Sequence, residues 1–211
     1  MMAIDAGAKK VITCESNKSI SEIAKKIIKK NGYKDLIKVI NKSSTILKVG
    51  KDLSQKADLL ISEIFSSELV GEGIQPSLLD AKKRLLKDKG KMIPEAAEIK
   101  VALLETNSEI KDKCFTNKIN GYDLSEFNKI TGNKFSLDLK NTDVTFLSNE
   151  KIAFYFDFYS DSLLKREHKS INIPIQKSGD CLGLITWMKI NLYQGVYLEN
   201  HPANNQKSHW T

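Results

Sequence analysis

The chain has 211 residues, of which 41% are apolar and 28% charged, and its 33 Lys and Arg residues against 26 Asp and Glu residues give a net charge of +7. This composition is typical of one or two globular domains, and it excludes a disordered tail or a coiled coil. No apolar run approaches the roughly 20 residues that span a membrane, and the N-terminal residues form no signal-peptide core. We therefore expect a soluble protein of the cytoplasm, the nucleus or both, with no membrane partner.

Neither the lysine runs nor the cysteines indicate a binding or catalytic site. Lys25, Lys26, Lys29 and Lys30 share one predicted helix, and such runs are usually its solvated face. Because no RNA-binding aromatic motif or phosphate loop accompanies them, we expect no direct contact with nucleic acid. The cysteines, being odd in number and far apart, match neither a disulfide framework nor a zinc site. We expect no metal, and reduced, mostly buried thiols at Cys14, Cys114 and Cys181.

The first third of the chain alternates strand and helix patterns. A β-branched run at 10–15 (KVITCE) predicts a strand. The next segment has helical periodicity, with a capping box at Ser19 and Glu22 and a stop at Gly32. The apolar positions of this helix recur on one face, which predicts that this face is packed: Ile20, Ile23, Ala24, Ile27 and Ile28.

Two more strands and a helix complete the α/β part. The runs 37–41 (IKVIN) and 57–62 (ADLLIS) read as strands, and the second is almost wholly apolar, as a parallel strand buried on both faces would be. A helix is expected from about Pro76 to a stop at Gly90.

After Pro94 the pattern becomes one of antiparallel strands, and helical patterns become scarce. Several of these runs alternate polar and apolar residues, and the expected strands are 98–105, 144–147, 152–158, 170–175, 183–191 and 195–199. The polar stretch 109–134 interrupts them and should project from the sheet. We therefore predict an α/β domain over 1–94 and a β domain over 95–211.

Acidic residues at strand ends are the most informative feature. Glu15 follows the first strand, and an acid at the carboxyl end of a parallel strand commonly accepts hydrogen bonds from ribose hydroxyls. The alternative is a solvated glutamate at the start of a loop, which a single residue of this kind does not exclude.

The loop after the apolar strand is richer in acids. Glu63, Glu68 and Glu72 occur in it without a basic residue, and their spacing does not match a calcium loop. Two carboxylates converging on a cavity, with Gly71 and Gly73 permitting a tight turn, would bind a planar cation such as guanidinium. The alternative is a helix start enriched in acids.

Several segments resemble the protein arginine N-methyltransferase family. Residues 61–73 (ISEIFSSELVGEG) resemble its double-glutamate loop, 11–16 (VITCES) its ribose-binding strand end, and 31–45 (NGYKDLIKVINKSST) the segment that borders the adenine. The similarity is closest to the branch of protein arginine N-methyltransferase 7, the monomethylating type. It covers nearly the whole chain, continuing through 85–105, 120–127, 179–192 and a terminal Ser208-His209-Trp210 that is similar to the family's Thr-His-Trp loop.

This resemblance implies a fold and an activity. The fold would be a partial Rossmann-like S-adenosylmethionine-dependent methyltransferase domain (α/β), followed by an antiparallel β-barrel domain with a dimerisation arm at about 109–134. The activity would be methyl transfer from S-adenosylmethionine to arginine guanidinium in proteins, including histone methylation. The implied partners are arginine-containing proteins such as histones or RNA-binding proteins, and a second copy or repeat forming a dimer or pseudo-dimer.

The resemblance also assigns roles in the arginine pocket. Glu63 and Glu72 correspond to the pair that clamps the substrate arginine, whereas Glu68 does not match the second clamp position and remains an alternative. His209 and Trp210 would close the pocket from the barrel side. Without the resemblance, Trp210 reads equally well as a packing residue at a barrel rim.

For the cofactor, the resemblance makes Glu15 the residue that holds the ribose and puts Ser44 and Thr45 near the adenine. The family's glycine-rich turn before the ribose-binding acid is absent, and residues 1–8 are similar to the end of the helix that follows it. Family members also continue beyond Thr211. We therefore predict a fragment, truncated at both ends, that binds the cofactor poorly or not at all. Two alternatives stay open: a non-catalytic dimerisation or basic-peptide-binding module, and a nucleic-acid binder driven by the +7 charge.

Overall fold

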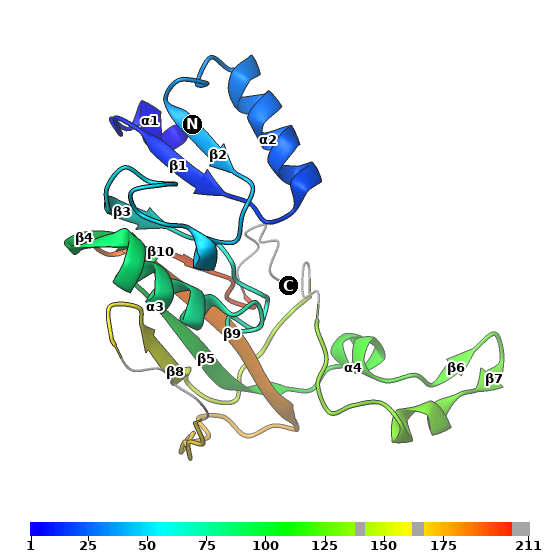
Figure 1. Ribbon diagram of the computed structural model, residues 1–211. Coiled ribbons are helices and arrows are strands. Elements are labelled where there is room, and N and C mark those ends of the chain that lie inside the picture. The colour runs from blue at the N-terminus through cyan, green and yellow to red at the C-terminus, as the bar shows by residue number, and fades with distance from the viewer. Residues whose placement is uncertain (138–141, 162–166, 204–211) are drawn as a thin grey trace. The chain divides into compact units, whose positions relative to one another are not determined.

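The computed structural model describes residues 1–137, 142–161 and 167–203. Its elements in chain order are α1 (Met2–Asp5), β1 (Val11–Cys14), α2 (Lys18–Lys30), β2 (Ile37–Ile40), the 3₁₀ turn η1 (Ser44–Ile46), β3 (Ala57–Ile61), α3 (Ile74–Leu85), β4 (Leu86–Ile93), β5 (Ala96–Glu105), α4 (Ser108–Cys114), β6 (Lys118–Ile119), β7 (Tyr122–Asp123), the 3₁₀ turn η2 (Ser125–Lys129), β8 (Lys151–Asp157), β9 (Cys181–Tyr193) and β10 (Val196–Glu199). Figure 1 shows them along the chain.

The chain divides into two compact units. Unit 1 comprises residues 1–62 and 75–93, and unit 2 comprises residues 63–74 and 94–211. The acidic loop at 63–74 therefore groups with the antiparallel sheet of unit 2, although the sequence pattern assigned it to the α/β domain.

Unit 1 contains two pairs of parallel strands. β1 pairs with β2 in a register that runs from Val11↔Ile37 to Cys14↔Ile40. β3 pairs with β4, and Leu60 lies opposite Met92. These pairs form separate two-stranded sheets, and α2 packs beside β2. The predicted α/β pattern is thus confirmed in its element types for this part of the chain.

The core of unit 1 joins α3 to the segment that follows β2. Its buried members come from the end of β2, the segment after η1 and the last two turns of α3: Ile40, Leu47, Leu53, Ala81 and Leu85. Ile12, Cys14 and Leu60 pack against this cluster and are partly buried. The carboxyl ends of β1 and β2 are therefore held beside the C-terminal half of α3.

Helix α2 differs from its prediction at both its cap and its packed face. Asn17, rather than Ser19, caps the helix, because its side chain accepts hydrogen bonds from the backbone of Ser19 and Ile20. Glu22 pairs instead with Lys25. The helix ends at Lys30, and Gly32, two residues later, has a φ of 82° in the left-handed region, as is common after a helix. The predicted apolar face is covered only in part within the described residues: Ala24 and Ile28 are partly buried, whereas Ile20, Ile23 and Ile27 are exposed.

Two predictions about the end of the α/β part are wrong. Gly90 does not stop a helix, because α3 ends at Leu85 and the chain continues at once as β4, which pairs with β3. Strand β3 is apolar but not buried on both faces, since Leu59 and Ile61 are 42% and 57% exposed. The first difference arises from pairing between segments about 30 residues apart, and the second depends on which elements cover the sheet; local periodicity reports neither.

Unit 2 is built on an antiparallel sheet with the strand order β10-β9-β5-β8. β5 is paired along both edges, with β9 and with β8. The β9–β10 turn places Gln194 and Gly195 at positive φ, as a two-residue hairpin turn requires. The core on this sheet includes Ala102, Leu104, Ile110, Ile185 and Trp187.

The described strands of unit 2 form an open sheet, and no closed barrel is present among them. The expected strands at 144–147 and 170–175 are reduced to isolated bridges, Leu104↔Phe146 and Ser148↔Ile175. Closure into a barrel therefore remains a prediction.

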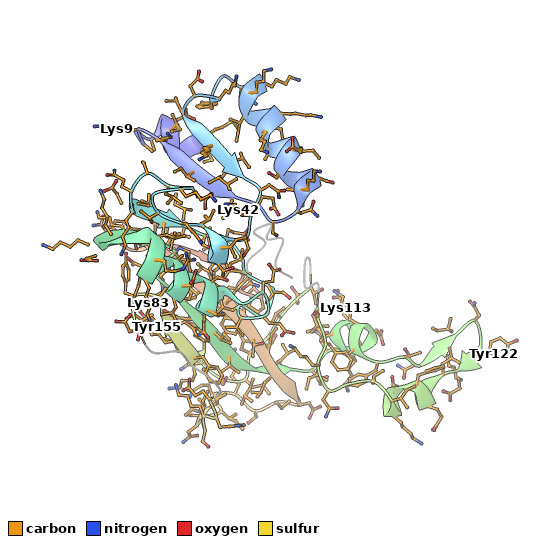
Figure 2. All side chains as sticks on the ribbon, viewed as in Figure 1. Lys9, Lys42, Lys83, Lys113, Tyr122 and Tyr155 are labelled. Carbon is orange, nitrogen blue, oxygen red and sulfur yellow. The ribbon has the colours of Figure 1, made fainter. Side chains whose placement is uncertain are left out.

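The stretch at 109–134 projects from the sheet of unit 2, as predicted (Figure 1). It contains α4, the hairpin β6–β7 and η2. The hairpin turns through Asn120 and Gly121, both at positive φ. Its tip carries Tyr122, which is 74% exposed and lies at the far end of the projection in Figure 2.

Candidate functional site

The carboxyl ends of β1 and β2 lie side by side in unit 1. The backbone N–H of Glu15 donates to the carbonyl of Ile40 over 3.0 Å. The side-chain amide of Asn41 then donates to the carbonyls of Glu15 (2.8 Å) and Ser16 (3.1 Å). This crosslink fixes the loop after β1 against the loop after β2, at the edge where open parallel sheets bind their ligands.

The Glu15 carboxylate has one oxygen engaged. Its Oε1 accepts the backbone N–H of Asn17 over 2.6 Å, and its Oε2 accepts no hydrogen bond among the described residues. The side chain is half-buried. Burial first, and then the charge of Glu15, raise the pKa of the neighbouring Cys14 thiol, which keeps that sulfur protonated. A carboxylate at this position could accept hydrogen bonds from the two hydroxyls of a ribose.

Ser44 and Thr45 belong to η1, in the segment that follows β2. Ser44 is half-buried and Thr45 exposed, and the Thr45 hydroxyl is 2.9 Å from that of Ser43. Asp52 connects the two ends of this segment. Its carboxylate accepts a hydrogen bond from the Lys42 ammonium (2.6 Å) and another from the backbone N–H of Lys48 (2.9 Å). The hydrogen bond from Lys42 is the main reason why the pKa of Asp52 lies below its ordinary value.

Arg84 of α3 reaches the same segment, and the sequence analysis did not single it out. Its guanidinium donates to the carbonyls of Leu47 (2.6 Å) and Ser44 (3.0 Å) and pairs with Asp80. The i, i+4 spacing of Asp80 and Arg84 is visible in the sequence. The contact with Ser44, 40 positions away, is not.

The acidic loop of unit 2 has Glu63 and Glu72 near its two ends, and both are exposed. Between them, Phe65 and Leu69 are buried, and the ring of Phe65 lies 6.3 Å from that of Phe158. The loop is therefore anchored through its middle, and both carboxylates remain accessible to a ligand.

Two glycines shape this loop for different reasons. Gly73 has a φ of 73°, in the left-handed region. Gly71 is required by close approach, since a Cβ there would lie 2.6 Å from the Ser66 hydroxyl oxygen, which accepts the Gly71 N–H. Leu69 also has a positive φ, of 68°, and a hydrogen bond from its N–H to the Ser66 carbonyl closes the turn.

Glu68 does have a basic partner, contrary to the expectation that the acidic loop lacks one. Its carboxylate pairs with the ammonium of Lys134, which lies 66 positions further along the chain. Glu68, the alternative clamp residue, is therefore already paired with a cation of this chain.

His209 and Trp210 lie outside the described residues. The chain leading toward them contains a cluster that the sequence analysis did not identify. The buried Lys100 ammonium contacts carboxylate oxygens of Glu150 (2.7 Å) and Glu199 (3.0 Å), and Glu199 also accepts the indole N–H of Trp187 over 2.9 Å. The ring of His201 lies 4.9 Å from that of Trp187. Aromatic packing and a buried ion pair therefore fix the end of β10.

The described part of the chain contains no group of three His, Cys, Asp or Glu residues that could hold a metal ion. None of its helices is long and apolar enough to cross a membrane. All three cysteines are free, and Cys181 is exposed while Cys14 and Cys114 are partly buried, so the expectation of mostly buried thiols is wrong for Cys181.

Sequence comparisons give named relatives along the whole chain. An arginine N(omega)-methyltransferase from Streptomyces achromogenes subsp. streptozoticus is 35% identical over 211 residues, which is 100% of this chain and 58% of that protein. Protein arginine N-methyltransferase 7 from Rattus norvegicus is 43% identical over 108 residues, or 50% of this chain and 16% of that protein. This chain therefore spans little more than half of the first relative. No family model matches it.

The fold agrees with these sequence relatives. The Trypanosoma brucei PRMT1 enzyme–prozyme heterotetrameric complex, solved with AdoHcy, superposes with a TM-score of 0.74 at 21% identity, covering 100% of this chain and 66% of that one. At this identity the likeness shows the fold alone. Taken with the sequence similarity along all 211 residues, it makes this chain a homologue of proteins named arginine N-methyltransferase.

Proposed function

We propose that this chain is the part of a protein arginine N-methyltransferase that carries the ribose- and adenine-binding loops and the double-glutamate loop. The reaction is transfer of a methyl group from S-adenosylmethionine to an arginine guanidinium in a protein. The observation that carries the proposal is the 35% identity with an arginine methyltransferase over every residue of the chain.

The acidic loop supplies what this substrate needs. An arginine guanidinium stays protonated at ordinary pH and is a poor nucleophile. Glu63 and Glu72 would bind it through charge-assisted, bidentate hydrogen bonds, which fix the plane of the group. The paired negative charge would draw the positive charge toward the bonded nitrogens and leave lone-pair density on the nitrogen that faces the methyl donor.

The cofactor-side residues suit S-adenosylmethionine. Glu15 has a carboxylate oxygen available for ribose hydroxyls, and Ser44 and Thr45 offer hydroxyl and backbone groups beside the adenine. When bound, the cofactor supplies an electrophilic methyl on its sulfonium. The residues of this chain bind and orient it; none of them needs to act as a nucleophile.

Finer features follow from the same proposal. His209 and Trp210 would close the arginine pocket, with Trp210 as a cation–π wall. The product would be monomethylarginine, on histones or RNA-binding proteins of the cytoplasm or nucleus. The antiparallel sheet of unit 2 would close as the family's barrel, with the arm at 109–134 serving a dimer or pseudo-dimer.

We also propose that the isolated chain binds S-adenosylmethionine more weakly than micromolar. The two parallel pairs in unit 1 are separate sheets, and β3 has exposed apolar side chains, whereas parallel sheets are usually covered on both faces. Isothermal titration of the chain with S-adenosylmethionine measures this directly, and micromolar affinity would contradict it.

The clamp is tested with an arginine-rich peptide titrated into the chain. Glu63→Gln and Glu72→Gln should each weaken binding by about tenfold or more, as expected for loss of a charged hydrogen-bond partner. Melting temperatures should stay close to wild type because both side chains are exposed. In an enzyme completed with the remaining segments of its relatives, turnover should fall further still.

The matched control is Glu126→Gln on the arm, which removes the same charge from a side chain that is 80% exposed and paired with Lys129. It should leave peptide affinity unchanged. An equal loss in the control would mean that net charge alone attracts the peptide and would overturn the clamp. A loss confined to Glu68→Gln would transfer the second clamp role to that residue.

A second candidate function rests on the arm. Its exposed apolar side chains include Tyr122, Phe127 and Ile130, a surface that favours a non-catalytic dimerisation module. Sedimentation would then show a dimer lost in Tyr122→Ser, while peptide binding would be insensitive to Glu63→Gln and Glu72→Gln.

A further inference from the structure

The turn that carries Ser44 and Thr45 is closed by a side chain from α3. The N–H of Leu47 donates to the Ser44 carbonyl over 3.2 Å, and Arg84 Nη2 donates to the same oxygen over 3.0 Å. Arg84 Nη1 donates to the Leu47 carbonyl over 2.6 Å. One guanidinium thus binds the carbonyls at both ends of the turn, at Ser44 and Leu47.

The guanidinium is itself held in place. Its Nε donates to Asp80 Oδ1 over 2.7 Å, and its Nη2 pairs with the other oxygen of that carboxylate. Because Asp80 lies one turn earlier on α3, the fork cannot rotate without breaking these bonds. The pKa of Asp80 lies below its ordinary value, chiefly through the hydrogen bond from Arg84.

Only an arginine can make this set of contacts. Its planar fork offers donors on three nitrogens in fixed directions, whereas a lysine has one nitrogen on a flexible stem. A 3₁₀ turn also ends in carbonyls without partners in the turn, which a cation can satisfy. The side chain of Leu47 is buried in the core with Ala81 and Leu85, so backbone and side chain of the segment are fixed to the same helix.

We infer that Arg84 is a positioning residue that holds the segment 44–47, and with it Ser44 and Thr45, in the conformation that receives the adenine. The inference rests on the proposed function in one respect, namely that the ligand received by this segment is the adenine of the cofactor. The ordering of the segment by Arg84 is a separate claim with its own measurement.

Amide hydrogen exchange tests the ordering. In Arg84→Lys, which keeps the charge and loses the fork, the Leu47 amide should exchange about tenfold faster, the ratio expected for losing a hydrogen bond to a charged group at a partly exposed site. The Glu15 amide, bonded to Ile40 in the neighbouring strand pair, should keep its rate. The control is Lys83→Met, the adjacent exposed cation of α3 labelled in Figure 2, which should change neither rate.

Titration with millimolar S-adenosylhomocysteine, followed through the Ser44 and Thr45 amide resonances, tests the positioning. Wild type and Lys83→Met should show the same shifts, and Arg84→Lys should bind about tenfold more weakly. If exchange responds but the wild-type resonances never move at millimolar ligand, Arg84 orders the segment, and the claim that this segment of the chain receives the adenine is overturned. If the resonances move and Arg84→Lys matches wild type in both measurements, the function stands and the inference is overturned.

Discussion

Strands β3 and β5 have similarly apolar sequences and different fates. Among the residues that the structure describes, β3 (ADLLI) is paired along one edge only, and its Leu59 is 42% exposed. β5 (AAEIKVALLE) is paired along both edges, and its Leu104 is 4% exposed. An apolar run therefore predicts a strand, while its burial depends on which elements are available to pair with it and cover it.

The comparison extends to charged groups. In unit 2, the buried Lys100 has two carboxylate partners, whereas in unit 1 the pair of Lys87 and Asp58 is largely exposed. The two ion pairs thus differ in how far their charges are removed from water. The exposed apolar surface of unit 1 is of the kind that further polypeptide covers in larger folds.

Truncating one leucine in each strand should give the largest difference. Leu104→Ala should lower the free energy of unfolding by about 2–5 kcal/mol, because it opens a cavity in a packed core. Leu59→Ala removes a side chain that is already half exposed and should cost less than about 1 kcal/mol. Urea unfolding followed by circular dichroism measures both, and equal losses would mean that β3 is covered in solution.

Removing the buried cation should have the next largest effect. Lys100→Met should destabilise unit 2 by about 1–3 kcal/mol, because Glu199 is left buried without its cationic partner. Lys87→Met removes a cation from an exposed pair and should produce no measurable change. Thermal unfolding compares the two, and the indole N–H resonance of Trp187, which donates to Glu199, should shift only in Lys100→Met.

Acid should produce the smallest of these effects. Burial raises the pKa of Glu199, but hydrogen bonds from Trp187 and Lys100 outweigh burial and leave the pKa below its ordinary value. A lowered pKa means that the contribution to stability is present above the unfolded value, near pH 4.3, and is lost as the pH falls through the folded value. In Lys100→Met this acid-induced loss should shrink, because burial then favours the protonated form; a loss as large as that of wild type between pH 6 and pH 3 would contradict the assignment.

Local sequence signals identified the elements whose partners are near in the chain. The β-branched run at 10–15 and the helical period before Gly32 both have causes within a few residues. The change of pattern at Pro94 and the glycines of the acidic loop were equally visible. Position after strands singled out Glu15 and the three acids of the loop, and the motif resemblance then selected Glu63 and Glu72 as the clamp pair.

What the tertiary structure decided are the pairings between distant segments. Residues 86–90 could continue a helix or form a strand, and the pairing of Leu86 and of 91–93 with β3 makes the segment strand β4. Glu68 gained Lys134 from a segment 66 positions away, and Arg84 reached Ser44 across 40 positions. The sequence by itself determined which backbone conformations are low in energy at each position, because those energies are local. Only the folded chain determined which side chains meet, because that depends on how the elements pack.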